Sequence, residues 1–205
     1  RHMLGIRREK GSKEVAPSEM RPKAYENMWR WVQDAKRSGL LGEFAAIALD
    51  GFTGLQDIVM SAVLWSAGTP TAIPGGDEYM RVVNTVLPLI SDLRSNGAVL
   101  AATAHTDIKT DRGGATLGHK LALIGKLRQN IPSLFSDIYA CRCESTSKDV
   151  CYMMQTRPGG FVETASTTVD AMPFDFDATI RDFAKPEEYG VGKVLRLIAE
   201  GGTHR

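Results

Sequence analysis

The stretch Glu43-Phe44-Ala45-Ala46-Ile47-Ala48-Leu49-Asp50 decides the expected fold. Its apolar residues follow one another without alternation, and it ends in a carboxylate. A strand that is covered on both faces has this pattern, which is typical of a parallel sheet. The segment Gly97–His105 repeats the pattern and also ends in polar residues. We therefore expect two neighbouring strands, each buried on both faces.

Amphipathic segments surround these two strands. One begins at Pro22, carries apolar residues at helical spacing and ends near Gly39. Apolar residues at helical spacing are usually part of a core, and we interpret these segments as core helices. The expected helices run from Pro22 to Gly39, from Leu55 to a loop at 66–76, and from Asp77 to Gly97, with Pro88 kinking or breaking the last.

The second half of the chain has a different pattern. A polar loop is expected over 106–116, and a helix is expected over 117–131. Two strands with alternating character follow, and the second is expected to pair with 161–165 across a glycine turn. The predicted elements after the helix are strands at 137–144 and 150–156 and a short helix at 193–200.

This order of elements predicts one α/β domain over residues 21–205, with a mostly parallel sheet flanked by helices and a late antiparallel hairpin. Residues 1–20 are polar and lack periodicity, so they are expected to form a flexible arm that begins with a cloning scar, Arg1-His2-Met3. Ligands of such sheets bind beyond the carboxyl ends of the strands. Asp50 and Thr103–His105 should therefore lie at one rim of the sheet.

Composition excludes several classes of protein. The 205 residues are 43% hydrophobic and 24% charged, which is ordinary for a globular protein and argues against general disorder. The net charge of +1 does not indicate a nucleic-acid or membrane partner, so such a site would depend on local clustering. No apolar run reaches the roughly 18–20 residues that span a bilayer, and we expect a cytoplasmic protein without a membrane partner.

The three cysteines do not form a recognisable pattern. Cys141 and Cys143 have C-x-C spacing, which suits neither a disulfide framework nor a zinc site, and we expect all three, with Cys151, to be buried in strands. A nucleophile elbow of the G-x-S-x-G type is not present, so Ser-His-Asp catalysis is not expected. Asp175 and Asp177 are interpreted as surface charges that alternate with buried rings.

Asp50, Thr103 and His105 have two interpretations each. Asp50 is either a carboxylate that holds Mg²⁺, which prefers hard oxygen ligands, or a turn-forming residue before Gly51. Thr103 and His105 either sense a γ-phosphate and orient a water, or are an ordinary strand-end hydroxyl and a solvated imidazole.

The order of four motifs resembles the later part of RecA-like P-loop ATPases, in particular a phage-encoded group that acts in recombination. These motifs are Asp50 with Leu55-Gln56-Asp57, then Ala102–His105, Gly118-His119-Lys120, and Gly125-Lys126. The resemblance covers roughly residues 22–185 and implies a RecA-like fold. It implies ATP and Mg²⁺ as ligands. It also implies a homo-oligomer that acts on DNA, with single-stranded DNA as the candidate partner, in recombination, replication or packaging of a phage or prophage within its bacterial host.

The resemblance also implies roles for individual residues. Asp50 corresponds to the Walker B aspartate that holds Mg²⁺ through water, and Thr53 and Thr103 would contact the nucleotide. Thr103 and His105 correspond to the strand that senses the γ-phosphate. Lys120, Lys126 or Arg128 would reach the nucleotide of a neighbouring subunit, and 106–116 corresponds to a loop that approaches DNA.

One motif of these ATPases is not found. The sequence contains no G-x-x-x-x-G-K-[ST]; the nearest segment, 113–121, has His119 before Lys120 and Leu121 in place of the hydroxyl residue. Either the phosphate loop is supplied elsewhere, or the chain is a non-catalytic structural or assembly module. A third hypothesis is a DNA-binding module that uses residues 106–128.

The local cluster of positive charge has two interpretations as well. It comprises Lys109, Arg112, His119, Lys120, Lys126 and Arg128, interrupted by Asp107 and Asp111. It is either a solvated surface or a phosphate-binding patch, for which Lys109, Arg112, Lys120 and Arg128 are the nucleic-acid candidates. Within this stretch there is no aromatic residue on which a base could stack.

Overall fold

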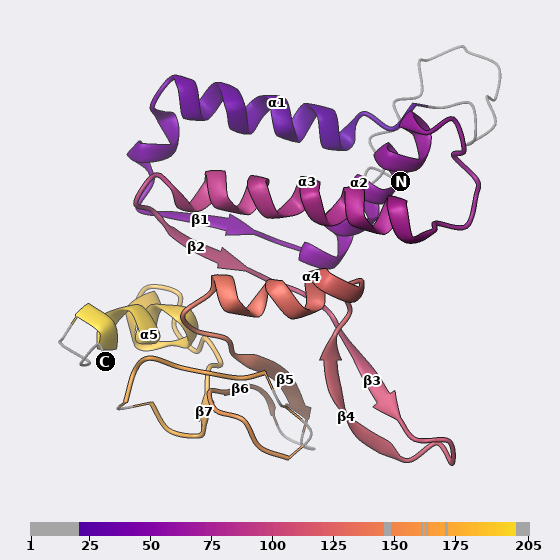
Figure 1. Cartoon of the computed structure of the whole chain (residues 1–205). Coiled ribbons are helices and arrows are strands. Elements are labelled where there is room, and N and C mark those ends of the chain that lie inside the picture. Colours follow the sequence, from indigo (N-terminus) through magenta and orange to yellow (C-terminus); the bar gives the residue numbers. More distant parts are fainter. Residues whose placement is uncertain (1–20, 146–148, 161, 163, 171, 200–205) are drawn as a thin grey trace, which may run out of the picture. The chain divides into compact units, whose positions relative to one another are not determined.

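A computed structural model describes residues 21–145, 149–160, 162, 164–170 and 172–199 (Figure 1). The arm expected at 1–20 lies outside the described residues. The chain divides into two compact units. Unit 1 contains residues up to His105 together with Leu121–Gln129, and unit 2 contains Thr106–Lys120 together with the residues from Asn130 onward.

Unit 1 is built on a pair of parallel strands. Strand β1 (Ala46–Leu49) pairs with β2 (Val99–Ala102), with Ala46 opposite Val99 and Leu49 opposite Ala102. Both strands lie inside the segments that the sequence predicted. Because the strands are parallel and in this register, their carboxyl ends meet at the same edge, as expected.

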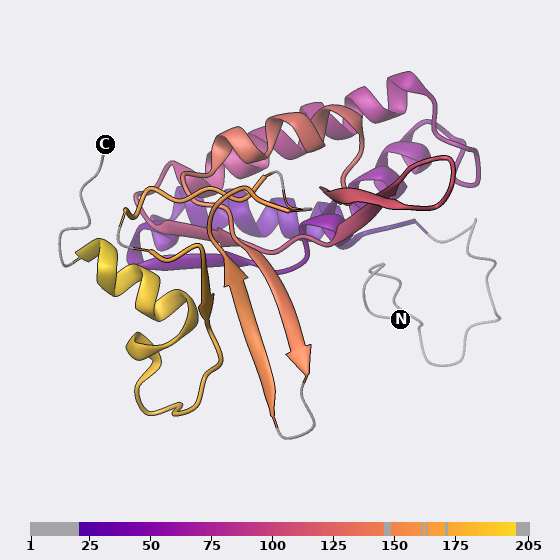
Figure 2. The same ribbon diagram turned by 90° about the horizontal axis from the view of Figure 1, so that it is seen from below.

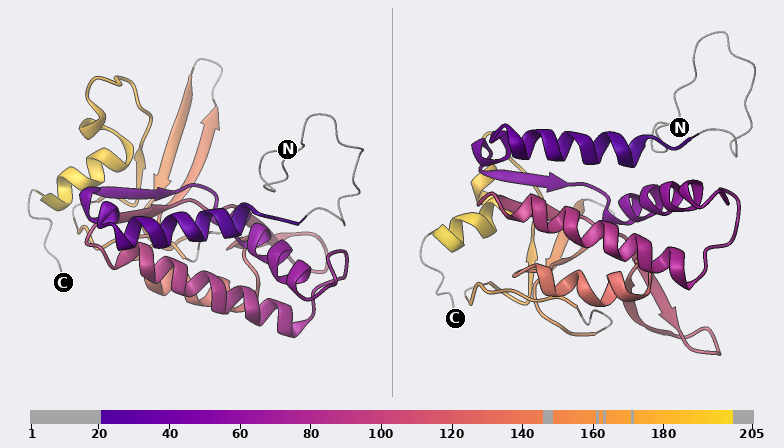
Figure 3. Two further views of the ribbon diagram at one scale, coloured as in Figure 1. Left: turned by 90° about the horizontal axis from the view of Figure 1, so that it is seen from above. Right: turned by 45° about the horizontal axis from the view of Figure 1, so that its top comes forward.

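Three long helices accompany the strand pair, and all three were predicted. They are α1 (Ala24–Arg37), α2 (Phe52–Ser66) and α3 (Gly76–Arg94), and a short 3₁₀ helix, η2 (Leu40–Glu43), follows α1. Helix α2 packs against α3, and α1 contacts both (Figure 3). The side chains buried in this unit come mainly from these helices and include Val32, Leu41, Phe52, Leu55, Val59, Val82, Val86, Leu89, Ile90, Leu123 and Leu127.

Helix α3 continues through Pro88, so the predicted break at this proline is wrong. Pro88 is exposed, whereas the next two residues, Leu89 and Ile90, are fully buried. Burial of these apolar side chains stabilises the helix on both sides of the proline and offsets the lost backbone hydrogen bond.

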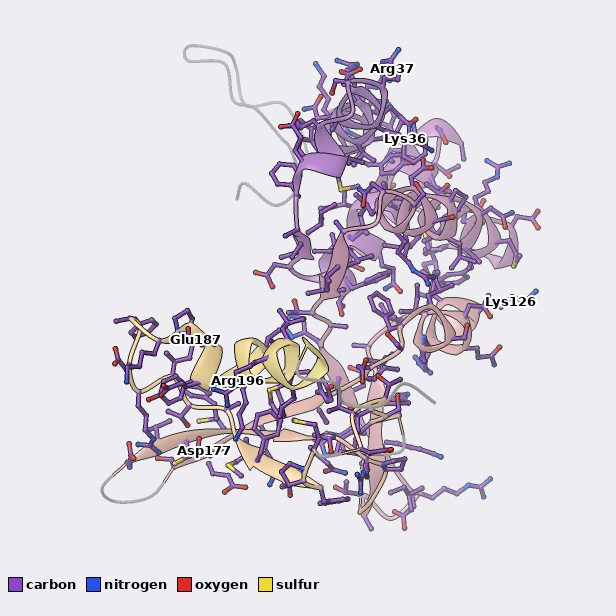
Figure 4. All side chains as sticks on the ribbon, turned by 90° about the vertical axis from the view of Figure 1, so that its left-hand side faces the viewer. Lys36, Arg37, Lys126, Asp177, Glu187 and Arg196 are labelled. Carbon is purple, nitrogen blue, oxygen red and sulfur yellow. The ribbon has the colours of Figure 1, made fainter. Side chains whose placement is uncertain are left out.

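A polar contact joins α1 to α3. Gln33 Nε2 of α1 donates to Asp92 Oδ2 of α3 at 2.9 Å, and Lys36 donates to the other carboxylate oxygen. These bonds, with that from Lys36 the larger cause, lower the pKa of Asp92. Figure 4 labels Lys36 beside Arg37 at the end of α1.

The expectation that the strands are buried on both faces is wrong. Ala46 and Ala48 of β1 are exposed, and Val99 of β2 is 49% exposed. Among the described residues the sheet has only two strands, so each of them is an edge strand with one unpaired side. The apolar composition of these two strands therefore did not indicate how much of their side-chain surface is buried.

The predicted mostly parallel, RecA-like sheet is also wrong. The described strands form three small sheets, of which only β1–β2 is parallel. The main cause is the segment that was expected to be a loop and a helix at 106–131. It forms two strands that pair with each other, β3 (Thr106–Thr110) and β4 (Thr116–Leu121), and a short helix, α4 (Gly125–Asn130).

The turn between β3 and β4 depends on Asp111. Its carboxylate accepts hydrogen bonds from the backbone N–H groups of Gly113 and Ala115, both at 2.8 Å. The Asp111 N–H in turn donates to the Ala115 carbonyl. An aspartate that binds its own turn in this way makes a tight connection, so the polar residues at 111–115 join two strands rather than form a long loop.

The larger sheet of unit 2 is antiparallel (Figure 2). It consists of β5 (Ala140–Ser145), β6 (Val150–Gln155) and β7 (Asp175–Asp177), with β6 in the middle. The two longer strands were predicted. The partner strand expected for β6 at 161–165 lies partly outside the described residues, and the described partners of β6 are β5 and β7. Two 3₁₀ helices, η3 (Pro132–Leu134) and η4 (Pro186–Glu188), and helix α5 (Gly190–Ala199) complete the unit.

Unit 2 has its own apolar core. Its buried members are Met154, Val169, Met172, Phe176, Ala178 and Val194. The cysteines do not belong to it: Cys141 and Cys143 are exposed and Cys151 is half-buried, contrary to the prediction. The charges at 175 and 177 flank Phe176, which is buried as predicted, but the ring of Phe174, which was also expected to be buried, is 45% exposed. Asp175 pairs with Arg142, and Asp177 pairs with Arg181.

One carboxylate connects two loops of unit 2. Asp137 Oδ1 accepts from the backbone N–H of Thr168 at 2.6 Å and from the hydroxyl of Thr167 at 3.0 Å. The hydroxyl of Tyr139 donates to the same oxygen at 3.3 Å. Burial of the Tyr139 ring is the largest cause that raises its pKa to about 12, so the phenol stays protonated over the neutral range.

Replacing Pro88 with alanine tests the account of α3. Alanine restores the N–H that can donate to the carbonyl of Asn84, and we expect the free energy of unfolding to rise by about 1–2 kcal/mol after the greater entropy of the unfolded chain is deducted. Urea unfolding followed by circular dichroism measures the change. The exposed Ser91→Ala variant on the same helix is the control and should change stability by less than about 0.5 kcal/mol. A less stable Pro88→Ala variant would contradict this account.

Candidate functional site

The candidate site lies at the carboxyl ends of β1 and β2. Asp50 follows β1 directly, and Thr103 follows β2. The Thr103 hydroxyl donates to Asp50 Oδ1 at 2.6 Å and accepts from the Gly51 N–H at 2.8 Å. A hydroxyl has one hydrogen, so its donation to Asp50 fixes the orientation of that carboxylate. Among the described residues, no group donates to the other oxygen of Asp50, and the side chain is exposed.

Backbone hydrogen bonds hold the turn beneath Asp50. The Thr103 N–H donates to the Leu49 carbonyl at 3.0 Å, and the Phe52 N–H donates to the Thr103 carbonyl at 2.7 Å. Gly51, between strand and helix, has φ +89°, a conformation that residues with a side chain rarely adopt. Thr103, the residue after β2, therefore connects the end of β1, the turn at Gly51 and the first residue of α2.

Thr53 and His105 also lie at the carboxyl ends of β1 and β2. The His105 N–H donates to the Thr53 hydroxyl oxygen at 3.1 Å, so the hydroxyl hydrogen of Thr53 can donate to a ligand. The imidazole of His105 is exposed. The structure therefore brings together four residues that the sequence singled out: Asp50, Thr53, Thr103 and His105.

Lys120 and Lys126 are not joined to this group by any contact among the described residues. Lys120 is on β4 and belongs to unit 2. Lys126 is on α4 of unit 1, where it is exposed and extends outward (Figure 4). It borders an apolar hollow of about 410 Å³ that Tyr79, Met80 and Val83 of α3 also line.

The four nucleic-acid candidates separate into two sets. Lys109, Arg112 and Lys120 lie on the β3–β4 hairpin of unit 2, and the first two are exposed. Arg128 lies in unit 1 and has a structural role. Its Nε donates to the Leu121 carbonyl at 2.9 Å and its Nη2 to the Leu123 carbonyl at 2.6 Å, which leaves it poorly placed to bind phosphate.

Sequence reasoning missed Gln56. This side chain of α2 is 7% exposed, and its Oε1 accepts from the Ile124 N–H at 2.6 Å. With Arg128, it fixes the segment 121–124 within unit 1. The available signal was a polar residue between Leu55 and Val59, inside the apolar stripe of the predicted helix.

Metal ligands are sparse in this protein. Across the described ranges, no group of three or more His, Cys, Asp or Glu side chains could hold a metal ion. Asp50 is therefore a single carboxylate with one oxygen available. That donor set suits Mg²⁺, which is often held by one or two carboxylates while phosphate oxygens and waters complete its coordination. It does not suit zinc, which requires several nitrogen or sulfur ligands.

In comparisons with known proteins, no family model, curated protein or solved structure matches the chain. None of the described helices combines the length and the apolar character needed to cross a membrane.

Replacing Thr103 tests the geometry of the site. Thr103→Val removes the hydroxyl and leaves the Gly51 N–H without its acceptor, so we expect the free energy of unfolding to fall by about 1 kcal/mol. Thr103→Ser keeps the hydroxyl and should retain most of the stability. Urea unfolding of both variants is the measurement, and equal stabilities for Val and Ser would show that the hydrogen bonds of the hydroxyl contribute nothing.

Proposed function

We propose that this protein binds Mg²⁺–ATP at the carboxyl ends of β1 and β2 and acts on DNA. The observation that carries the proposal is the hydrogen bond from Thr103 to Asp50. It orients a carboxylate at the strand ends of a parallel pair, where ligands of α/β proteins bind, and leaves one oxygen available.

Each residue of the group has a role in this proposal. Asp50 accepts hydrogen bonds from the waters of Mg²⁺ or binds the ion directly. The Thr53 hydroxyl and the backbone N–H groups of Thr53 and Gly54 donate to phosphate oxygens, since the amino-terminal end of a helix favours negative charge. The exposed imidazole of His105 is available to orient a water. Mg²⁺, when bound, neutralises charge on the phosphates.

The proposal concerns binding rather than rapid hydrolysis. The sequence has no G-x-x-x-x-G-K-[ST] segment, whose backbone amides would surround the phosphates and position them for transfer. A neighbouring subunit of a homo-oligomer, with Lys126 or Lys120 as candidate cations, would have to supply further phosphate contacts. The substrate is thus a magnesium nucleotide, and turnover depends on assembly.

The proposed contact with DNA rests on the β3–β4 hairpin. Lys109 and Arg112 are exposed, whereas the nearby carboxylate of Asp111 is engaged by two N–H groups of its own turn. The hairpin therefore presents cations to solvent while one of its two acidic groups is occupied. Such side chains bind the phosphate backbone without regard to sequence.

A structural or assembly module is the second candidate. The observation that favours it is the uncovered strand pair: Val99 is 49% exposed and Phe44, just before β1, is 43% exposed. Exposed edge strands with apolar side chains can pair with strands of another chain. A protein that assembles through β1 or β2 and ignores nucleotide would fit this function.

Replacing Asp50 tests the nucleotide site. Wild-type protein should bind a slowly hydrolysed ATP analogue with Mg²⁺ in calorimetric titration, and Asp50→Asn should weaken binding at least about tenfold because the available carboxylate oxygen loses its charge. The control is Asp57→Asn, an exposed aspartate of α2 that should leave the affinity unchanged. No heat from folded wild-type protein would reject this function and favour the assembly module.

Replacing the hairpin cations tests the DNA contact. Lys109→Ala and Arg112→Ala should each weaken binding to a DNA oligonucleotide and reduce the slope of log affinity against log salt by about 1, since each removes one phosphate contact. Fluorescence anisotropy at several salt concentrations measures both quantities. Arg30→Ala, which changes an exposed arginine of α1, is the control. Unchanged slopes for both hairpin variants would exclude this surface as the DNA contact.

A further inference from the structure

A second hollow, within unit 2, has the features of a site for one base. Its volume is about 260 Å³, and its lining includes His119, Arg142, Gln155, Gly159, Phe174 and Asp175. This volume lies just below the roughly 300 Å³ at which small-molecule pockets begin, so the hollow suits one planar ring system better than a whole nucleotide.

Gln155 provides a fixed acceptor in this hollow. The side chain is 7% exposed, and its Nε2 donates to the carbonyls of Arg157 at 2.8 Å and Gly159 at 3.1 Å. Both N–H groups are used, so the orientation of the amide is determined. No described residue donates to its Oε1. This oxygen can therefore accept a hydrogen bond from an N–H group of a ligand.

Arg142 and Asp175 provide a paired donor and acceptor. Two nitrogens of the guanidinium donate to the two carboxylate oxygens at 2.8 and 3.1 Å, and Nε donates to Glu144 at 2.8 Å. These bonds with Asp175 and Glu144 raise the pKa of Arg142, which therefore stays charged. Each terminal nitrogen keeps a second N–H, and each oxygen of Asp175 can accept another bond.

Phe174 provides an aromatic wall. Its ring is 45% exposed and lies against Gly159, where an added Cβ would stand only 2.7 Å from Phe174 Cζ. Close packing on glycine holds one side of the ring and leaves surface on which a base can stack. His119 lies on β4 of the basic hairpin, and its backbone pairs with that of Val162, so this hollow is directly connected to the hairpin.

We propose that this hollow, which we call the base site, binds one base of single-stranded DNA and prefers guanine. The two acceptors, Gln155 Oε1 and the Asp175 carboxylate, match the N1–H and amino donors of guanine, and a free N–H group of Arg142 matches its O6 acceptor. The base stacks on Phe174 while Lys109 and Arg112 bind neighbouring phosphates. The inference rests on the DNA-binding half of the proposed function and is independent of the nucleotide site.

The test uses two labelled oligonucleotides, a thymidine octamer and the same octamer with one central guanosine, in fluorescence anisotropy without ATP or Mg²⁺. Wild-type protein should bind the guanosine octamer at least about fivefold more tightly. Phe174→Leu should remove that preference, and Gly159→Ala should reduce it although it retains every polar group of the base site, because the new methyl group displaces the ring.

Tyr152→Leu is the matched control: it removes an aromatic ring that is 58% exposed on the same sheet but does not line the base site. Circular dichroism verifies that each variant is folded. Equal affinity of wild-type protein for the two octamers, or loss of the preference in Tyr152→Leu, would overturn the base site. A guanine preference in a protein that gives no heat with Mg²⁺–ATP would reject the nucleotide site and leave the base site in place.

Discussion

The hydroxyl group of Thr103 is the contact on which the rest of unit 1 depends. Thr103 follows β2, and its hydroxyl bonds to the Gly51 N–H and the Asp50 carboxylate, which follow β1. These partners are more than fifty residues away from Thr103 in the chain. The left-handed conformation of Gly51 allows the chain to reverse from strand into helix beneath it. Strand pairing, the start of α2 and the orientation of the Asp50 carboxylate therefore all involve Thr103.

The sequence predicted the elements of unit 1 well because their apolar residues recur at helical spacing or in short uninterrupted runs. It did not predict how the strands are covered. Alanine fills half of β1 and half of β2, and an exposed alanine costs so little that its presence does not indicate burial. The β3–β4 hairpin was missed for a related reason: apart from Ile108, Leu117 and Leu121 its residues are polar or small, so no alternation identified it as a sheet.

The candidate site was partly predictable. The rule that strand ends share one edge placed Asp50 and Thr103 together, and the structure adds the hydroxyl that connects them. The function of Arg128 was not predictable, since its partners are backbone carbonyls, which every sequence has. The basic stretch lacked an aromatic residue nearby, yet folding supplies one: Phe174 and His119, far apart in the sequence, line the same hollow.

The chain passes back and forth between its two units, which limits how the protein can be divided into folded fragments. The boundary is crossed three times, after His105, after Lys120 and after Gln129. A fragment that ends at His105 would lack Leu123 and Leu127, which are buried in unit 1. No single cut in the polypeptide, and no single crossover between genes, separates one unit intact from the other. The hairpin Thr106–Lys120 is a continuous insertion between two segments of unit 1, so its sequence can vary while the segments that surround Asp50 are inherited together.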